Sequence, residues 1–213
     1  MSKGKLITIE AGDGSGKATQ TKALYDRLLA EGYQVLKVEY PDYQSESSAL
    51  VRMYLGGEFG QQAENVSAYG ASAFFAVDRY ASYLLKWRQA YESGWIILAD
   101  RYTTSNMVHQ AVKLKDSAER EEFLTWLWDF EFGRLQLPVP DRVIYLDMPP
   151  EISDIHEKDT SYLHHCHRAY NEVAEKYGWV KISCAQQGNL RTVQDIHEDV
   201  YQAVKEILRD END

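Results

Sequence analysis

A glycine-rich turn between an apolar run and a helical pattern most restricts what this chain can fold into. The apolar run at 6–10 suits a buried strand, and the turn that follows reads Ala-Gly-Asp-Gly-Ser-Gly-Lys-Ala-Thr over 11–19. Such a turn at the start of a helix directs backbone N–H groups and the helix dipole at phosphate oxygens. Lys17 would add a charge that reaches the β and γ phosphates. The order strand, turn and helix favours a phosphate-binding loop over a surface turn that happens to carry Gly and Lys.

This loop departs from the consensus Gly-x4-Gly-Lys-[Ser/Thr] at two positions. Ala11 replaces the first glycine, and Ala18 replaces the hydroxyl residue that usually binds Mg²⁺. Magnesium normally keeps several waters, so one more water could fill the vacancy. Thr19 lies about 100° further round the helix and is badly placed to substitute. The loop therefore favours ATP binding more clearly than fast turnover.

Strand and helix patterns alternate along the chain. Strands are expected at 6–10, 34–39, 95–100, 142–147 and 179–183, and helices at about 16–31, 64–92, 117–133, 161–177 and 192–209. The alternation predicts an α/β fold, a five-stranded parallel sheet flanked by helices on both faces. No linker or repeat divides the sequence, so a single domain over 1–213 is expected. Ligands of such sheets bind at the carboxyl ends of the strands.

The third expected strand ends in an acid and a base, Asp100 and Arg101. Asp100 could hold Mg²⁺ through a water or accept a proton, and Arg101 could grip a phosphate with two hydrogen bonds. A structural ion pair at the strand end is the alternative. Opposite a phosphate-binding loop, the functional interpretation is favoured.

Charge and composition exclude several classes of function. The formal net charge is −10, which disfavours binding to DNA or RNA, because that affinity depends on phosphate neutralisation. No apolar run reaches the roughly 18 residues of a membrane span, and no signal peptide is evident. Two cysteines, Cys166 and Cys184, are too few for a disulfide framework or zinc site. A cytoplasmic protein that binds small anions at a local site is expected.

Several segments together resemble the thymidylate kinase family of P-loop nucleoside monophosphate kinases. The matching segments are 13–20, Tyr40-Pro41, Phe75-Ala76-Val77-Asp78-Arg79, Asp100-Arg101-Tyr102 with Ser105, His109-Gln110, and the tail from 184 to 200. The resemblance runs from about residue 5 to 209. It implies a P-loop NTPase fold, transfer of the ATP γ-phosphoryl group to dTMP to give dTDP, a requirement for Mg²⁺, and a homodimer.

The resemblance also implies which residues form the site. ATP phosphates would be bound by Asp13, Gly14, Ser15, Gly16, Lys17, Ala18 and Thr19. The substrate dTMP would be bound by Asp13, Tyr43, Phe75, Arg79, Arg101, Tyr102, Ser105, Asn106 and Gln110. Catalysis would rest on Lys17, Asp100 and Arg101, with Asp100 holding the metal through a water.

Individual roles follow from the same resemblance. Asp13 would accept a hydrogen bond from the sugar 3′-hydroxyl, and Phe75 would stack on thymine. Arg79 would donate to a base carbonyl, and Arg101 would hold the acceptor phosphate. Tyr102 would crowd the sugar 2′ position and so favour deoxynucleotides. For Phe75, packing in the core of an aromatic, alanine-rich helix is the alternative.

The chain departs from the family in two further places. Tyr43 stands where the family often carries an arginine, so the grip on phosphate there is weaker. The arginine-bearing lid expected near 153–160 is short or not represented in this sequence. The helical signal at 151–153 ends after one turn. This favours a lid that the protein has but this sequence does not include, over a lid that the protein has lost.

Rival functions remain open at this point. One is a kinase for another substrate, such as dUMP or a deoxynucleoside. Another is a nucleotide-binding regulator that has lost catalysis. This alternative is supported by Ala11, Ala18 and the absent lid arginine. The run His164-His165-Cys166-His167 is expected to be a solvated helix face and not a metal site. The aromatic residues Phe123, Trp126, Trp128 and Phe130 are expected to form helix packing or a dimer face.

Overall fold

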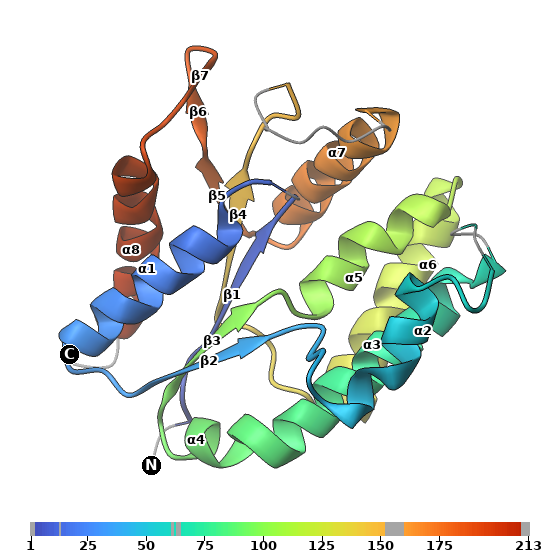
Figure 1. Ribbon diagram of the computed structural model, residues 1–213, viewed down its shortest axis with the longest axis horizontal. Helices are drawn as coiled ribbons and strands as arrows, with labels where there is room; N and C mark the ends of the chain where they lie inside the picture. The colour runs from blue at the N-terminus through green and yellow to red at the C-terminus, as the bar shows by residue number, and fades with distance from the viewer. Residues whose placement is uncertain (1–2, 13, 61, 63–64, 152–159, 210–213) are drawn as a thin grey trace.

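A five-stranded parallel sheet forms the centre of the computed structural model (Figure 1). The structure describes residues 3–12, 14–60, 62, 65–151 and 160–209, without the side chains of 160–162 and 209. The strands are β1 (Leu6–Ala11), β2 (Val35–Glu39), β3 (Ile96–Asp100), β4 (Arg142–Asp147) and β5 (Val180–Ser183), in the order β2-β3-β1-β4-β5. The predicted α/β fold with five parallel strands is confirmed.

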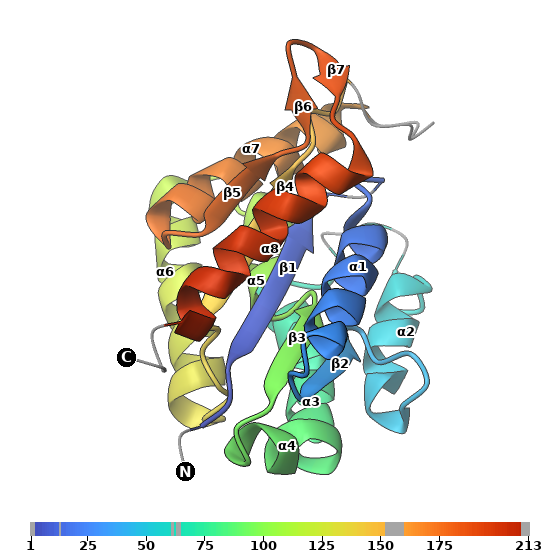
Figure 2. The same cartoon turned by 90° about the vertical axis from the view of Figure 1, so that its left-hand side faces the viewer.

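Helices cover both faces of this sheet (Figures 1 and 2). On one face lie α1 (Lys17–Ala30) and α8 (Val193–Arg209). On the other face or beside it lie α2 (Ala49–Leu55), α3 (Ala68–Ser82), α4 (Arg88–Glu92), α5 (Thr103–His109), α6 (Ser117–Trp128) and α7 (Thr160–Lys176). A short antiparallel hairpin, β6 (Ala185–Gln186) and β7 (Asn189–Leu190), projects between β5 and α8.

Alternation along β1 divides the core between the two faces. Ile7 and Ile9 pack with α1 and α8, while Leu6 packs on the opposite side with Trp87 and Tyr102. Successive side chains of a strand point to opposite faces, so Glu10 lies on the same side as Leu6, toward α5 and α7. A charged residue is thus carried into the interior at the end of an apolar strand, where it is fully buried.

Two of the predicted helices contain π-helical turns that the periodicity did not indicate. The helix expected at 64–92 consists of α3, a π segment η3 (Tyr83–Trp87) and α4. The helix expected at 117–133 consists of α6 and a π segment η5 (Asp129–Arg134). Each π turn contains one buried side chain, Trp87 in η3 and Glu131 in η5.

The strand ends bring the predicted site residues to one edge of the sheet. In the parallel register Ile9 lies beside Asp100, and Ala11 beside Leu146. The loops after β1, β3 and β4 therefore open at the same edge, the edge at which such sheets bind ligands. Among the described residues, none of the helices has the length and apolar character to cross a membrane.

Candidate active site

The loop between β1 and α1 has the geometry of a phosphate cradle. Gly14 and Gly16 have φ values of 68° and 75°, in the left-handed region that favours glycine. Gly16 is the N-cap of α1 and offers no side-chain hydrogen bond to the first N–H groups, which leaves these donors for a ligand. A Cβ at Gly16 would meet nothing within 4 Å, and the buried hydroxyl of Ser15 has no hydrogen-bond partner among the described residues. These features fit a bound phosphate chain.

Lys17, the first residue of α1, contacts Asp100 at the end of β3. Its Nζ forms an ion pair with Oδ1 of Asp100, and the two side chains are only 14% and 5% exposed. The contact arises because β1 and β3 are neighbours and Asp100 lies beside Ile9, close to the loop that follows β1. The expectation that the loop and Asp100 meet at one edge of the sheet is therefore confirmed. Asp13 lies outside the described residues, and Ala18 and Thr19 are exposed.

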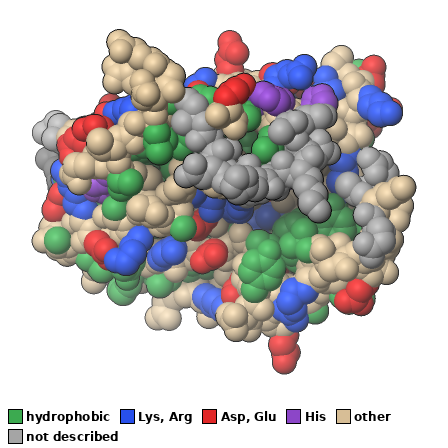
Figure 3. All heavy atoms as spheres, turned by 45° about the horizontal axis from the view of Figure 1, so that its top comes forward, with side chains coloured by type: hydrophobic (Ala, Val, Ile, Leu, Met, Phe, Trp, Pro, Cys, Tyr) green, Lys and Arg blue, Asp and Glu red, His purple; other side chains and the backbone are tan. Residues whose placement is uncertain are grey.

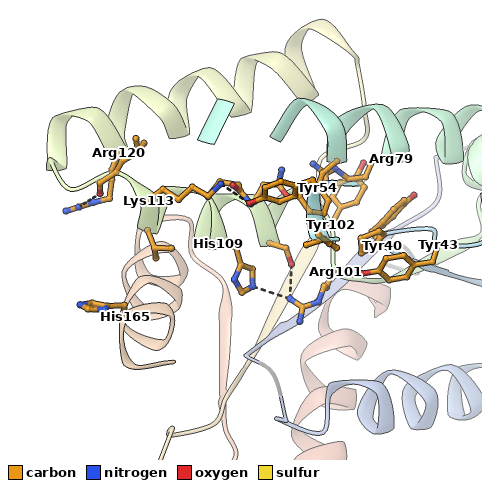
Figure 4. Close-up of a pocket in the computed structure, with 18 of the residues that line it drawn as sticks. Tyr40, Tyr43, Tyr54, Arg79, Arg101, Tyr102, His109, Lys113, Arg120 and His165 are labelled. Carbon is orange, nitrogen blue, oxygen red and sulfur yellow. Dashed lines mark hydrogen bonds between the residues drawn. The ribbon is translucent and has the colours of Figure 1, made fainter. Parts of the chain in front are cut away.

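Arg101 has a strained backbone next to this pair. Its φ of 67° is uncommon for a residue with a Cβ and costs about 1–3 kcal/mol. The conformation is held from both sides, because the N–H of Arg101 donates to the carbonyl of Ile9 at 3.2 Å and the N–H of Tyr102 donates to Glu10 at 3.2 Å. The turn directs the guanidinium of Arg101 into a cavity, where Nη1 lies 3.4 Å from Ser105 Oγ and 3.3 Å from His109 Nε2 (Figure 4).

Glu10 is the buried centre of this region, and the sequence analysis did not identify it. Besides the N–H of Tyr102, its carboxylate accepts hydrogen bonds from Thr104 Oγ1 at 2.5 Å, Ser105 Oγ at 2.7 Å and the Tyr170 hydroxyl at 3.3 Å. The carboxylate therefore fixes the start of α5 and joins it to α7. A charged residue at the end of an otherwise apolar strand was the available signal.

A cavity of about 760 Å³ lies between α2, α3 and α5 and reaches Arg101. In the space-filling view, Lys and Arg side chains meet hydrophobic ones in a hollow at this edge (Figure 3). The predicted substrate residues among the described part of the chain all line it: Tyr43, Phe75, Arg79, Arg101, Tyr102, Ser105, Asn106 and Gln110. The structure adds Tyr54, His109 and Lys113, which the sequence analysis did not select. The rings of Phe75 and Tyr54 pack edge to face, with 6.1 Å between their centroids.

Two buried polar atoms in the wall of the cavity lack a partner. Asn106 Nδ2 and Gln110 Oε1 have no hydrogen bond among the described residues, although both side chains are almost fully buried. They lie one helical turn apart, so one donor and one acceptor are presented side by side. Buried polar groups normally have partners, and unpaired ones in a cavity wall indicate where a ligand binds.

Arg79 and Tyr102 are buried and hydrogen-bonded to other residues of the protein, which their predicted roles in substrate binding did not indicate. Arg79 Nε and Nη2 donate to the Glu131 carboxylate at 2.7 and 2.5 Å, and both side chains are buried. Burial alone would lower the pKa of Arg79, but the charge of Glu131 outweighs it and raises that pKa. A hydrogen bond to a base carbonyl would have to come from the remaining edge of the guanidinium, and this role stays a prediction.

Tyr102 is fully buried, and its hydroxyl donates to the carbonyl of Pro138 at 3.2 Å. Burial raises its pKa well above the ordinary value, so the hydroxyl stays protonated. Its ring stacks on that of Phe132, with 6.4 Å between the ring centroids, and it also lines the cavity. Contact with the sugar would have to involve the part of the ring that lines the cavity, so the predicted role at the 2′ position stays a prediction.

Few groups at this edge could bind a metal directly. Asp100 remains the candidate, through a water, because Ala18 supplies no oxygen. No cluster of three or more His, Cys, Asp or Glu side chains arranged for a metal occurs in the part of the chain that the structure describes. His167 instead contacts Asp147 at 2.7 Å, and His164 lies 3.8 Å from Glu151. The lid predicted near 153–160 falls almost wholly outside the described residues.

Comparison with known proteins agrees with this geometry. Residues 9–196 match the family model described as thymidylate kinase. A thymidylate kinase of Mycobacterium tuberculosis (strain ATCC 25618 / H37Rv) is 33% identical over 150 residues, which cover 70% of this chain and 68% of that protein. The thymidylate kinase of Plasmodium falciparum is 26% identical, with 96% and 91% covered. A probable thymidylate kinase of Pyrococcus horikoshii is 28% identical, with 97% and 98% covered.

Proposed function

The chain belongs to the thymidylate kinase family, and from this premise we propose that it transfers the γ-phosphoryl group of ATP to dTMP, giving dTDP. The observation that carries the proposal is the cavity that ends at Arg101, beside the Lys17–Asp100 pair. A nucleoside monophosphate in this cavity would place its phosphate between Arg101 and the phosphate loop. The unpaired atoms of Asn106 and Gln110 would then face its other end.

Catalysis by this arrangement rests on positioning and charge. Lys17 would leave Asp100 and contact the transferring phosphoryl group, where its charge stabilises the transition state. Arg101 would hold the acceptor phosphate through its planar guanidinium. Asp100 would then be released to orient the attacking oxygen or a hydrated metal. Holding donor and acceptor in line accounts for much of the rate enhancement in such enzymes.

Mg²⁺ is proposed as the metal of this reaction, held by Asp100 through a water. When bound, it would neutralise charge on the β and γ phosphates. The residues present fit a mostly hydrated ion, because one buried carboxylate faces the loop and Ala18 supplies no hydroxyl ligand.

The pattern of unpaired atoms supports an imide base such as thymine. Asn106 Nδ2 offers a donor and Gln110 Oε1 an acceptor, and thymine carries carbonyl oxygens next to an N–H. Uracil offers the same pattern without the methyl group, whose burial is worth about 1–3 kcal/mol of discrimination. A coupled assay of ADP release with dTMP, dUMP, dCMP and thymidine as competing acceptors tests the proposal. The highest kcat/KM is expected for dTMP, and a preference for dCMP or for thymidine would overturn the assignment.

A nucleotide-binding regulator is the second candidate, and Ala18 is the observation that favours it. Such a protein would bind dTMP and ATP in the same places without turnover. Calorimetric binding of dTMP together with the ADP assay separates the two, since binding at micromolar concentration without ADP release would support the regulator.

We also propose that the protein is a homodimer. Apolar side chains remain exposed along α3 and the following π turn: Val77, Tyr80, Leu84 and Leu85, the last of these 80% exposed. A stripe of this kind on the surface of a monomer usually marks an interface. Sedimentation at micromolar concentration should give a dimer, and Val77→Glu combined with Leu85→Glu should give a monomer. A monomeric wild-type protein would refute this part of the proposal.

A reducing, cytoplasmic environment is proposed from the thiols. Cys166 and Cys184 are both buried, and neither forms a disulfide within the part of the chain that the structure describes. Burial raises the pKa of Cys184 to about 11, which keeps this thiol protonated and unreactive. Thiol titration of the denatured protein isolated from its own cells should count both cysteines as free.

A further inference from the structure

His109 occupies a central place in the cavity without a role in the proposed reaction. It is the last residue of α5 and lines the cavity beside Arg101. Its Nε2 lies 3.3 Å from Arg101 Nη1 and 3.1 Å from the Tyr170 hydroxyl, and its Nδ1 lies 4.0 Å from Cys166 Sγ. In the close-up, His109 and Arg101 point toward one another from opposite ends of the same turn and helix (Figure 4).

The neighbours of His109 require different hydrogen positions on its ring. Arg101 carries only donors, so a hydrogen bond with it needs the lone pair of Nε2. The Tyr170 hydroxyl donates its single hydrogen to Glu10, so a hydrogen bond from His109 to Tyr170 needs a hydrogen on Nε2. The thiol of Cys166 can donate to Nδ1, which again suits the hydrogen on Nε2. Nε2 can serve only one of these hydrogen bonds at a time, and the charged donor Arg101 forms the stronger one.

We propose that His109 is a positioning residue for Arg101, an inference that rests on the proposed function. With the nucleotide absent, Nε2 accepts from Arg101 and holds the guanidinium at the phosphate end of the cavity. Because the guanidinium has five N–H donors, this hydrogen bond can persist while the other donors bind the substrate phosphate. A hydrogen bond that is kept in the complex lowers the cost of ordering Arg101 for the substrate.

A double-mutant cycle tests whether His109 acts through Arg101. The variants are His109→Leu, Arg101→Ala and both together, with kcat/KM for dTMP measured under ATP saturation. Loss of a hydrogen bond to a charged group predicts a drop of about tenfold for His109→Leu, mainly through KM for dTMP, and little change in KM for ATP. In the Arg101→Ala background the same change should cost less than about twofold.

Conservative and matched variants separate positioning from a structural role. His109→Gln keeps an acceptor near the place of Nε2 and should recover activity to within about threefold of wild type. His164→Leu makes the same substitution at an exposed histidine of α7 that does not line the cavity, and it should leave KM for dTMP unchanged. If His109→Leu does not fold, His109→Met provides the measurement with an unbranched side chain.

The outcomes distinguish this inference from the proposed function. Calorimetric titration of the wild-type protein with dTMP is done first, and failure to bind or phosphorylate dTMP would refute the proposed function itself. If wild type binds and turns over dTMP while the effects of His109→Leu and Arg101→Ala multiply independently, only the positioning role is overturned. A His109→Gln variant as impaired as His109→Leu would overturn it as well.

Discussion

At the residue scale, the meeting of Lys17 and Asp100 is the contact on which the chemistry depends. Replacing Lys17 by Ala removes the charge expected on the transferring phosphoryl group. We expect kcat to fall about 10²–10³-fold while calorimetric affinity for dTMP changes little, because the acceptor site does not include this residue. Lys22→Ala is the matched control, since Lys22 is exposed on α1 and pairs only with Asp26 among the described residues. A Lys17→Ala variant with near-normal turnover would contradict the assignment.

Ala18 is the residue at which the loop departs most clearly from a phosphotransferase consensus. Ala18→Ser restores the hydroxyl at the first turn of α1, where it could replace one water on the metal. We expect the Mg²⁺ concentration for half-maximal rate to fall several-fold, with KM for dTMP unchanged. The control is Thr19→Ser, which keeps a hydroxyl one position further on. An unchanged Mg²⁺ dependence in Ala18→Ser would mean that the metal does not approach this turn.

At the scale of elements, one buried ion pair connects α3 to the π turn after α6. Arg79 and Glu131 are both buried, and Thr103 adds a hydrogen bond to Glu131 at 2.7 Å. Glu131→Gln would leave the charge of Arg79 buried and unpaired. We expect a loss of about 3–5 kcal/mol in the free energy of unfolding, measured by urea denaturation. Glu92→Gln, in an exposed pair with Arg88, should show no change. A similar small effect in both variants would contradict the structural role of the pair.

A second link between elements joins the end of β4 to α7 and β5 through Asp147. Its Oδ1 lies 2.7 Å from His167 Nε2, and its Oδ2 lies 2.9 Å from Lys181 Nζ. Burial alone would raise the pKa of Asp147, but these two hydrogen bonds outweigh it, so that pKa lies below the ordinary value of 3.8. A carboxyl with a lowered pKa stabilises the fold above its unfolded pKa and loses this contribution as the pH falls through its folded pKa.

The lowered pKa of Asp147 predicts how the stability of Asp147→Asn, relative to wild type, changes with pH. Near pH 6, the variant should be about 1–2 kcal/mol less stable than wild type in urea denaturation. The difference should shrink as the pH falls below 3.8, because the wild-type carboxyl then also becomes neutral. Asp26→Asn, at an exposed position on α1, is the control and should show no such trend. A difference that stays constant down to acid pH would contradict the charge contribution of Asp147.

For the whole molecule, the strand pattern predicted the architecture because buried parallel strands are continuous apolar runs. All five expected strands occur within a residue or two of their expected bounds. The short helices α2 and α5 were not predicted, because seven residues are too few to show a helical period. The π turns at Trp87 and Glu131 were also missed, since they depend on tertiary contacts and not on local pattern.

The site was predictable where a motif fixes geometry and not where distant elements meet. The loop before Lys17 and the turn at Asp100 could be placed from the order of elements alone. The network around Glu10, at the end of β1, needs partners from two distant places in the chain. These are the segment from the end of β3 to the start of α5, and α7. His109 gained its importance only through contacts with Tyr170 and Cys166, more than fifty residues away. Such pairings cannot be seen in one sequence without a fold.

The central claim is that this cavity and loop together transfer a phosphoryl group from ATP to dTMP. Rapid-quench measurement of a single turnover, with ATP labelled in its γ-phosphate and excess enzyme and dTMP, tests it most directly. The account predicts that the label appears in dTDP at a rate that Lys17→Ala lowers about 10²–10³-fold. Retention of the label in ATP, with dTMP bound at the site, would contradict it.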